Sequence, residues 1–382
     1  MTTNVKPIAV LVEKTKNTPK VWGLTGAERL RRVFARLGVT VVTAKAAAKE
    51  AADTGVIVIR TDYAYDKPVL AGMLKNPNTL VDAEGKPVAA YTTVKNIDVA
   101  TKWVKEAKGA KAPAKHTKKT FAQVGADFNS DLRKKEVPYC LPLDPKTHKA
   151  LEWRIFMGTY KGVTDLVTKY FWPRPAAVVT RWCTKLGITP NQITVVGGIL
   201  MLYALWAFSK GMYVEGLIAG WIFTFFDTVD GKLARVSFTA SKIGNVLDHG
   251  IDLVHPPFWY VAWGYGLVHV GMGIDPTVLN WLFFVIVGGY IFQRVLEGYF
   301  IVRFNIHMHI WRKFDSFFRL ITARRNPNML MMTAAVIVGR PDWAVWAVAG
   351  WTAASLLVHM EQILSAEVLN LRGRKIESWL QR

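Results

Sequence analysis

Four aspartates stand at regular spacing in one short stretch of the chain. Asp227 and Asp230 are three residues apart, and Asp248 and Asp252 are four residues apart. Both spacings place a pair of side chains on one face of a helix. Converging carboxylates repel one another, and a hard divalent cation such as Mg²⁺ or Mn²⁺ removes the repulsion because it prefers oxygen ligands. Two such ions could clamp a diphosphate and stabilise the charge that develops during an in-line displacement.

Small and cationic residues separate the two pairs. Gly231 follows the first pair and leaves backbone room for a ligand. Ala234 keeps the facing surface small, and Arg235 supplies a planar cation that suits phosphate oxygens. Gly244 lies one turn before Asp248, where two helices could approach closely. A polar loop between two apolar segments would rarely show such regular spacing.

The whole pattern, D-x2-D-G-x2-A-R-x8-G-x3-D-x3-D, resembles the motif of the CDP-alcohol phosphotransferase family at all eight defined positions. The resemblance implies transfer of a phosphoalcohol group, of the phosphatidyl type, from a CDP-linked donor to an acceptor hydroxyl with release of CMP, in phospholipid or polar-lipid biosynthesis. By the same resemblance two Mg²⁺ or Mn²⁺ ions are bound by Asp227, Asp230, Asp248 and Asp252. Asp252 also serves as the general base that takes the proton of the acceptor.

A segment just before the first apolar helix carries a second resemblance. Thr189 can cap that helix, and Pro190 can occupy its first turn. Family members carry a similar Pro-Asn-x-x-Thr signature where the CDP moiety binds. The residues that the resemblance assigns to the CDP donor are Pro190, Asn191, Gln192, Ile193, Gly231, Arg235 and Ser241.

Composition favours a membrane as the partner of this basic chain. Its 382 residues include 49 Lys and Arg against 28 Asp and Glu, a net charge of +21, and 51% are hydrophobic. The basic residues cluster beside apolar stretches, so an anionic lipid surface is expected rather than nucleic acid. Cys140 and Cys183 are far apart and indicate neither a disulfide framework nor a Cys-type zinc site.

The apolar pattern predicts an α-helical integral membrane protein with six transmembrane helices, preceded by a cytoplasmic α/β domain. The expected spans are 191–209, 213–235, 243–270, 277–304, 327–339 extended on its N-terminal side, and 342–365. Basic residues at one set of span ends place both termini and the aspartate motif on the cytoplasmic side of the inner membrane. The expected divisions are 1–125 for the α/β domain, 126–185 for a linker and a juxtamembrane helix, 186–368 for the membrane domain and 369–382 for a basic tail.

Three features of the membrane part carry further expectations. Leu151 to Pro173 predicts one amphipathic helix at the interface, interrupted by Pro173 and Pro175, in which Lys161 and Asp165 pair on the surface. Gly216 and Gly220 form a small-xxx-small pair that could pack helices within one protomer or between the two protomers of a homodimer. Pro256-Pro257 should kink the third span, and His255 is expected to pack between helices rather than bind a ligand.

The first part of the chain alternates strands and helices, which predicts an α/β layer with a mostly parallel sheet. The expected strands are Ile8–Val12, Val39–Thr43 and Val56–Arg60, with a hairpin over Thr79–Tyr91; the expected helices are Gly26–Leu37, Pro68–Leu74 and Asn96–Lys108. The order resembles a nucleotidyltransferase domain, in which Thr18-Pro19-Lys20 and Asp62 would stand for the substrate lysine and the metal carboxylate. Glu13–Asn17 lacks the glycines that wrap phosphates, so a degenerate, non-catalytic domain is expected. It would pair protomers, hold a partner or shield the active site.

Two basic segments leave alternatives open. The Lys-rich stretch 102–119 is expected to be a solvated linker, with lipid headgroups as a second possibility. The second segment is either a positive-inside loop or an anion pocket for a phosphorylated acceptor or lipid headgroup. Its charged residues are His307, His309, Arg312, Lys313, Arg319, Arg324 and Arg325. His307 and His309 are two residues apart and do not share a helix face, so no metal site is expected there.

The sequence is compatible with three alternative classes of function. The first is the phosphotransferase, with either CDP-diacylglycerol or a soluble CDP-polyol as donor and an inositol phosphate, glycerol phosphate or another polyol as acceptor. The second is a bifunctional enzyme whose N-terminal domain makes its own CDP-alcohol. The third is a transporter or membrane scaffold, because intramembrane carboxylates also mark ion pathways.

Overall fold

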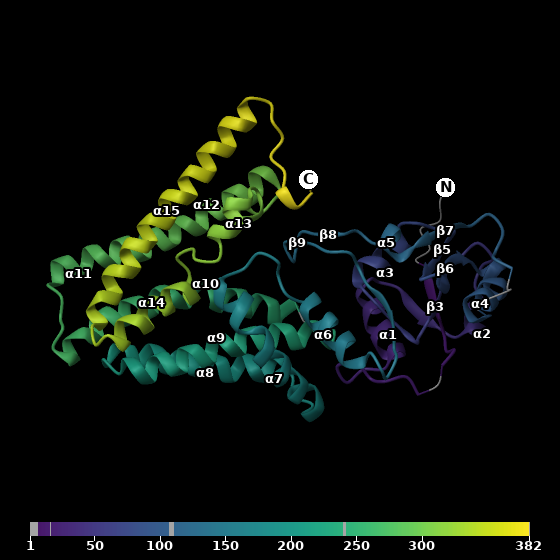
Figure 1. Ribbon diagram of the computed structural model, residues 1–382, viewed down its shortest axis with the longest axis horizontal. Coiled ribbons are helices and arrows are strands. Elements are labelled where there is room, and N and C mark those ends of the chain that lie inside the picture. The colour runs from purple at the N-terminus through teal and green to yellow at the C-terminus, as the bar shows by residue number, and fades with distance from the viewer. Residues whose placement is uncertain (1–6, 16, 107–110, 240–241, 382) are drawn as a thin grey trace. The chain divides into compact units, whose positions relative to one another are not determined.

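The computed structural model describes residues 7–15, 17–106, 111–239 and 242–381, without the side chains of 242–249. The chain forms two compact units (Figure 1). The N-terminal unit contains Met1–Asn129, Lys135–Gly158 and Val236–Phe238. The helical unit contains Ser130–Lys134, Thr159–Arg235 and Thr239–Arg382.

A six-stranded mixed sheet forms the centre of the N-terminal unit. Its strands are β1 (Ile8–Val12), β2 (Thr40–Val42), β3 (Gly55–Arg60), β5 (Thr79–Ala83), β6 (Lys86–Thr93) and β7 (Thr117–Thr120), in the order β2-β1-β3-β6-β5-β7. β1 pairs in parallel with β2 and β3, and β5 pairs in parallel with β7. β6 runs antiparallel to both β3 and β5. Between β5 and β6 the chain reverses at Glu84 and Gly85, which both have positive φ. The predicted hairpin is confirmed, but the sheet is more mixed than expected.

Alternation along the strands creates two apolar layers. Ala9, Ile57 and Ile59 face one side of the sheet, while Ile8, Val10 and Val58 face the other. The first side packs against α1 (Gly26–Arg36) and α3 (Lys67–Leu74), and the second against α2 (Ala44–Ala47) and α4 (Ile97–Glu106). The remaining elements here are the 3-10 turn Val94–Asn96, α5 (Phe121–Val124), β4 (Tyr63–Tyr65), which pairs with β10 (Cys140–Pro142), and α6 (His148–Gly158). A short pair, β8 (Phe128–Asn129) and β9 (Lys134–Lys135), lies at the junction of the two units in sequence.

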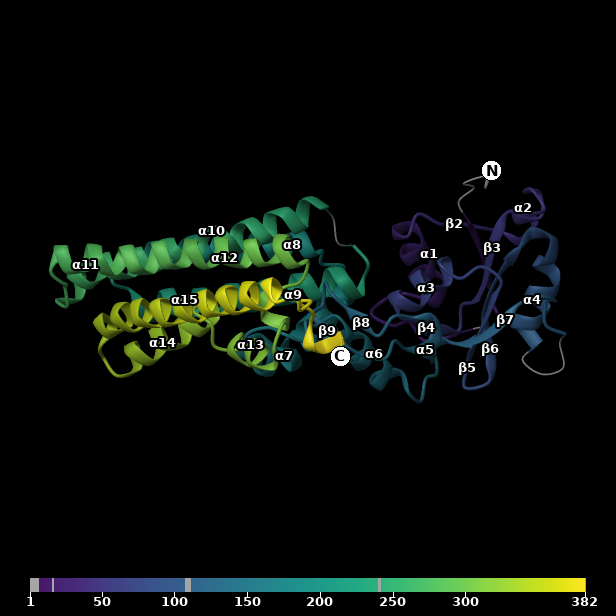
Figure 2. The same cartoon turned by 90° about the horizontal axis from the view of Figure 1, so that it is seen from above.

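Helices make up the second unit. They are α7 (Pro173–Leu186), α8 (Pro190–Ser209), α9 (Tyr213–Val236), α10 (Lys242–Gly266), α11 (Pro276–Phe283), α12 (Gly289–Phe304), α13 (Lys313–Phe318), α14 (Arg325–Ile337) and α15 (Pro341–Leu371). Short turns complete it at Val167–Phe171, Leu267–Val270, Phe284–Gly288, Met308–Ile310 and Trp379–Gln381. Among the described residues, three stretches are long and apolar enough to cross a membrane: Pro190–Ser209, Pro276–Phe304 and Pro341–Leu371. In both views α12 and α15 lie side by side (Figure 1, Figure 2).

The juxtamembrane region differs from the single helix that the sequence predicts. α6 ends at Gly158, a π-helical turn follows at Val167–Phe171, and Pro173 occupies the first turn of α7 instead of interrupting a helix. The expected surface pair of Lys161 and Asp165 is also wrong. Asp165 is buried, and its carboxylate accepts hydrogen bonds from the Asn326 side chain (3.0 Å) and the Thr168 backbone (2.9 Å).

Glycines on α9 allow its neighbours to approach within the same protomer. A Cβ at Gly216 would lie 2.5 Å from the Phe208 ring, and one at Gly220 would lie 3.0 Å from the end of Met329. The small-xxx-small pair therefore packs helices inside one chain. Two tryptophans connect α10 to its neighbours, because the Trp259 indole donates to the Met201 carbonyl (3.1 Å) and the Trp263 indole to the Pro341 carbonyl (2.9 Å).

His255 lies inside this core. It is 4% exposed, its Nδ1 lies 2.6 Å from the Ile251 carbonyl, and its ring stands edge-on to Phe223 and Trp259. Packing between helices therefore accounts for this histidine. Pro256 and Pro257 follow it inside α10.

Candidate active site

Asp230 lies one turn after Asp227 on α9, and its carboxylate accepts a hydrogen bond from a residue of α8. The hydroxyl of Thr194 donates to one Asp230 oxygen over 2.5 Å, and the same hydroxyl lies 3.1 Å from the Pro190 carbonyl. Thr194 has this position because α8 begins at Pro190, after the Thr189 cap. The start of α8 therefore orients the second aspartate of the motif.

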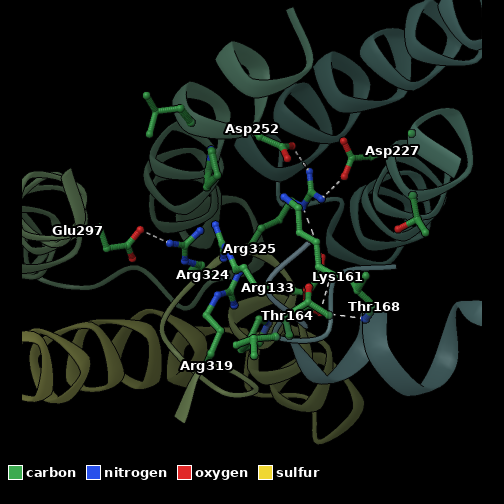
Figure 3. A pocket seen from close by; sticks show the side chains of 18 of the residues that line it. Arg133, Lys161, Thr164, Thr168, Asp227, Asp252, Glu297, Arg319, Arg324 and Arg325 are labelled. Carbon is green, nitrogen blue, oxygen red and sulfur yellow. Dashed lines mark hydrogen bonds and ion pairs between the residues drawn. The ribbon is translucent and has the colours of Figure 1, made fainter. Parts of the chain in front are cut away.

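Asp227 and Asp252 meet from two different helices. Arg325, the first residue of α14, donates one N–H to Asp227 and another to Asp252, each over 2.5 Å. Figure 3 shows the guanidinium of Arg325 between the two carboxylates. Its central carbon also lies 5.1 Å from the centre of the Phe223 ring. Carboxylates of α9 and α10 thus converge closely enough to share one cation.

The donor set around Asp230 fits a divalent cation. Its second oxygen is buried and has no hydrogen-bond partner among the residues that the structure describes. Asp227 and Asp230 both line a small cavity of about 10 Å³, whose wall also includes Ile193. That volume is about the size of one water molecule or ion, and carboxylate oxygens are the ligands that Mg²⁺ and Mn²⁺ prefer. Asp248 and Gly244 belong to the part of α10 whose side chains are not described, and Ser241 lies outside the described residues.

A larger cavity of about 390 Å³ opens beside these carboxylates. Its cationic lining consists of Arg133, Lys161, Lys232, Arg235, Arg294, Arg319, Arg324 and Arg325. Asp227 and Asp252 lie on its wall, and Figure 3 shows Arg319, Arg324 and Lys161 gathered on the side away from them. Arg319 is only 8% exposed, and its Nε and Nη1 have no hydrogen-bond partner within the described ranges. Buried guanidinium donors without acceptors favour a multiply charged anion in this cavity.

Part of the segment that is predicted to bind the CDP donor caps the start of α8. Thr189 and Gln192 form a capping box, with the Thr189 N–H donating to the Gln192 side chain over 2.8 Å. Asn191 is exposed at the helix start, and Ile193 lines the small cavity. Helix capping therefore accounts for the Gln192 side chain.

Gly231 and Arg235 lie together in the larger cavity. A Cβ at Gly231 would lie 3.4 Å from Nη1 of Arg235, an ordinary van der Waals contact, so this guanidinium lies directly against position 231. Ala234, on the same turn, is 9% exposed, in keeping with the small facing surface that the motif requires.

Arg133, Arg294 and Glu297 are site residues that sequence reasoning missed. Glu297 accepts hydrogen bonds from Arg294 (3.0 Å), from Arg324 and from His309 (3.2 Å). This carboxylate holds two cavity arginines in place. Arg294 and Glu297 are ionisable residues inside an apolar stretch, and that signal could have indicated a buried charged site.

Some residues of the basic segment 303–325 line the large cavity, and others form structural ion pairs outside it. Arg319, Arg324 and Arg325 line the large cavity, whereas Arg312 pairs with Asp315 and Glu361. The expectation that His307 and His309 form no metal site stays a prediction. His309, Glu297 and His359 bring one possible ligand atom each within 4.8 Å of one another, a group that spacing along the chain could not reveal.

Asp62 of the N-terminal unit is engaged by its own neighbours. Arg60 donates to both of its oxygens (2.8 and 2.7 Å), and Thr15 donates to one of them (3.0 Å). Burial raises the pKa of the Asp62 carboxyl, but the contact with Arg60 outweighs burial and holds this pKa below its ordinary value. An arginine therefore occupies the position where a metal would be expected.

Converging carboxylates lie beside a basic cavity in the helical unit, and three described stretches of this unit are long and apolar enough to cross a membrane. Residues 187–358 match the model of the CDP-alcohol phosphatidyltransferase family.

Named relatives share parts of this domain. Archaetidylinositol phosphate synthase of Pyrococcus horikoshii is 36% identical over 80 residues, which is 21% of this chain and 42% of that protein. Phosphatidylinositol phosphate synthase of Mycobacterium marinum is 30% identical over 93 residues, 22% of this chain and 40% of that protein. Cholinephosphotransferase 1 of Gallus gallus is 28% identical over 160 residues, 37% of this chain and 43% of that protein. The chain thus spans less than half the length of these curated relatives.

Among solved structures, Mycobacterium tuberculosis phosphatidylinositol phosphate synthase with CDP-DAG bound matches 50% of this chain and 94% of its own. The two are 15% identical, with a TM-score of 0.39.

Proposed function

We propose that the helical unit transfers a phosphoalcohol group, of the phosphatidyl type, from a CDP-linked donor to an acceptor hydroxyl and releases CMP. One observation carries the proposal: Asp227 of α9 and Asp252 of α10 converge on a single cation, one turn from Asp230 and beside a basic cavity. A site that handles a diphosphate needs this combination of carboxylates for cations and cations for phosphates.

The chain's own residues divide the work. Divalent cations, when bound by the four motif aspartates, would neutralise the donor diphosphate and make CMP a better leaving group. Thr194 orients Asp230, and Arg325 holds the carboxylates of Asp227 and Asp252 close together through a hydrogen bond to each. Asp252 receives the proton of the acceptor hydroxyl. The CDP part of the donor contacts Gly231 and Arg235, together with Pro190, Asn191, Gln192, Ile193 and Ser241.

A phosphorylated polyol is the acceptor that the basic cavity favours. Arg319 and Lys161 lie on the wall of the cavity that also holds Asp252, so an anchored phosphate would bring a neighbouring hydroxyl toward the base. Two of the relatives are named as synthases of inositol phosphate lipids, which is consistent with a phosphate-bearing acceptor. Free polyols would leave the donors of Arg319 without an acceptor.

A lipid donor, of the CDP-diacylglycerol type, is supported by an apolar groove of about 490 Å³. The groove runs between α10 and α12 and is lined by Leu253, Val254, Pro257, Phe258, Val261, Val287, Tyr290, Ile291, Arg294 and Val295. Leu253, Tyr290 and Arg294 also line the basic cavity, so the groove continues from it. An acyl chain fits this lining, whereas a soluble CDP-polyol has nothing to bury there.

The setting of the site is part of the proposal. We infer that the chain has six spans and forms a homodimer. We also infer that both termini and the active site lie on the cytoplasmic side of the inner membrane. The N-terminal unit, which we infer to be a non-catalytic nucleotidyltransferase-like domain, keeps Asp62 paired with Arg60 instead of with a metal.

The test uses the purified full chain in detergent with Mn²⁺, CDP-diacylglycerol and a panel of polyols with and without phosphate. CMP and the lipid product are measured by mass spectrometry. The expected result is metal-dependent CMP release with phosphorylated polyols, and a loss of at least about 100-fold in Asp252→Asn with retained Mn²⁺ binding. No CMP release with any pair of substrates would favour a transporter or scaffold instead, and full activity of Asp252→Asn would remove its role as the base.

A further inference from the structure

Residues 376–381 fold back onto the connection between α12 and α14 within the helical unit. After α15 the chain turns back toward α13 (Figure 1). Ile376 is buried and belongs to an apolar cluster with Phe300 of α12 and Trp311 of the connection. The side chain of Ser378 is also buried. Segment 376–381 is therefore part of the packed core at this end of the helical unit.

Backbone carbonyls of the connection receive hydrogen bonds from this segment. The Ser378 hydroxyl donates to the Ile310 carbonyl over 2.7 Å, and the Trp379 N–H donates to the Trp311 carbonyl over 3.1 Å. Both carbonyls lie at the end of the 3-10 turn Met308–Ile310, where a helix leaves its last acceptors without internal partners. A buried carbonyl that loses its donor is costly, so segment 376–381 stabilises the turn.

The side chain of Trp379 reaches α13. Its indole N–H donates to the Ser316 hydroxyl over 2.9 Å, and this hydroxyl donates to the His309 carbonyl over 2.8 Å. The Lys313 ammonium lies 5.8 Å from the centre of the indole ring. One aromatic side chain thus joins the 3-10 turn to α13.

The turn and α13 both lead to arginines of the basic cavity. Arg319 directly follows α13, and its backbone N–H continues the hydrogen bonding of that helix. His309, in the turn, has its Nε2 3.2 Å from a carboxylate oxygen of Glu297. Glu297 in turn accepts hydrogen bonds from Arg294 and Arg324. The turn and α13 therefore bear on three of the guanidinium groups that line the cavity.

We propose that segment 376–381 positions the cationic wall of the basic cavity: Ser378 and Trp379 hold the 3-10 turn and α13, and through them Arg319 and the arginines bound to Glu297. This inference rests on the proposed function, because the cavity is assigned there to the phosphate of the acceptor. Ser378 and Trp379 do not line the cavity, so they act only through the residues that they hold. The motif carboxylates lie on α9 and α10, which segment 376–381 does not hold by these hydrogen bonds.

The experiment uses the full chain in detergent with the variants Ser378→Ala and Trp379→Ala. Gln381→Ala is the matched control, because Gln381 lies in the same short turn, is uncharged and is exposed. Hydrogen exchange is followed for peptides that cover residues 305–319 and for peptides of α8 and α9. Binding of inorganic phosphate is measured by isothermal titration calorimetry without divalent cations. CMP release is measured with varied CDP-diacylglycerol and with varied amounts of the phosphorylated polyol that supports the fastest release.

For Ser378→Ala and Trp379→Ala we expect about tenfold faster exchange over residues 305–319, with the protection of α8 and α9 unchanged. The Kd of inorganic phosphate and the KM of the phosphorylated polyol should each rise about tenfold, while kcat and the donor KM stay within about twofold of the parent values. A general loss of stability would not separate the two KM values.

Exchange, phosphate Kd and acceptor KM equal to those of Gln381→Ala would overturn the proposal. Equal rises in the donor and acceptor KM, together with lost protection in α9, would overturn it as well, because the segment would then stabilise the whole unit. If the parent chain released no CMP, the proposed function would fail, whereas exchange and the Kd of inorganic phosphate would still decide whether segment 376–381 positions the cavity arginines.

Discussion

Thr194 of α8 donates its hydroxyl hydrogen bond to Asp230 of α9 over 2.5 Å, which leaves the other Asp230 oxygen buried and without a partner among the described residues. The geometry is that of an outer residue that orients a metal ligand. Thr194→Val keeps the shape of the side chain and removes the donor. We expect Mn²⁺ affinity to fall about tenfold, as for other residues that orient ligands.

Mn²⁺ binding to the purified protein, followed by electron paramagnetic resonance, measures this change. Thr194→Ser restores the hydroxyl and should restore the affinity. Equal Mn²⁺ affinity in Thr194→Val and the parent protein would show that Asp230 needs no orientation from α8.

Arg325 neutralises Asp227 and Asp252 through ion pairs with both. In Arg325→Met the two carboxylates face each other without a cation, which should cost roughly 2 kcal/mol of stability, less than a fully buried pair because the Asp252 side chain is 41% exposed. A divalent cation should remove much of this cost. We therefore expect Tm in EDTA to fall, and the rise in Tm on addition of Mn²⁺ to be larger in the variant than in the parent chain.

The control for this prediction is Arg340→Met, which breaks an ion pair with Asp342 remote in sequence from the motif. Its thermal unfolding should not depend on Mn²⁺ beyond the response of the parent protein. A Tm of Arg325→Met that responds to Mn²⁺ no more than Arg340→Met does would show that Arg325 and the metal do not share the same carboxylates.

Local patterns explain what the sequence could predict. Strand Ile8–Val12 and the hairpin at Glu84-Gly85 follow from apolar runs and turn residues that are contiguous in the chain, and the structure confirms both. The aspartate pairs are also local, since each lies within one helical turn. Their spacing therefore makes the α9 carboxylates and Asp252 candidates without knowledge of the fold, and their roles stay a prediction.

Contacts between distant segments explain what was missed. Arg133 reaches the cavity from the segment between β8 and β9, and Arg294 and Glu297 reach it from α12. The group of Glu297, His309 and His359 has no common spacing. The prediction of one helix in the juxtamembrane stretch was wrong for another reason. Its apolar spacing fits a helix from Leu151 to Pro173, but Gly158 ends α6, and Pro173 then starts a new helix.

Lys161 makes the basic cavity sensitive to pH. Burial, followed by the charges of Arg133, Arg235, Arg319 and Arg324, lowers the pKa of the Lys161 ammonium to about 8. Below that pH the group is charged and would attract the phosphate of the proposed acceptor; above it the charge is lost. We expect kcat/KM for a phosphorylated acceptor to fall about tenfold as pH rises through 8, the effect of one charge-assisted hydrogen bond. A bound phosphate favours the ammonium, so the corresponding inflection in kcat should lie at higher pH.

Steady-state kinetics between pH 6.5 and 9.5 test this dependence, the range chosen to bracket about one unit on each side of the Lys161 transition. In Lys161→Met the step near pH 8 should disappear and the acceptor KM should be high throughout. Lys161→Arg stays charged over this whole range, so the step should also disappear, but the acceptor KM should stay low. A step that persists unchanged in Lys161→Met would assign it to another group.

The groove between α10 and α12 predicts how the enzyme should respond to the length of the donor's acyl chains. Val254 lies on its wall and is 56% exposed, so Val254→Trp can fill the groove without disturbing the core. Displacing a few methylene groups should raise the KM for a long-chain CDP-diacylglycerol about tenfold, at about 0.8 kcal/mol per methylene. A short-chain donor that does not reach Val254 should keep its KM. Leu202→Trp, at a position 59% exposed on α8 and outside the groove, is the control and should change neither value. Equal effects of Val254→Trp on both donors would mean that the acyl chains lie elsewhere.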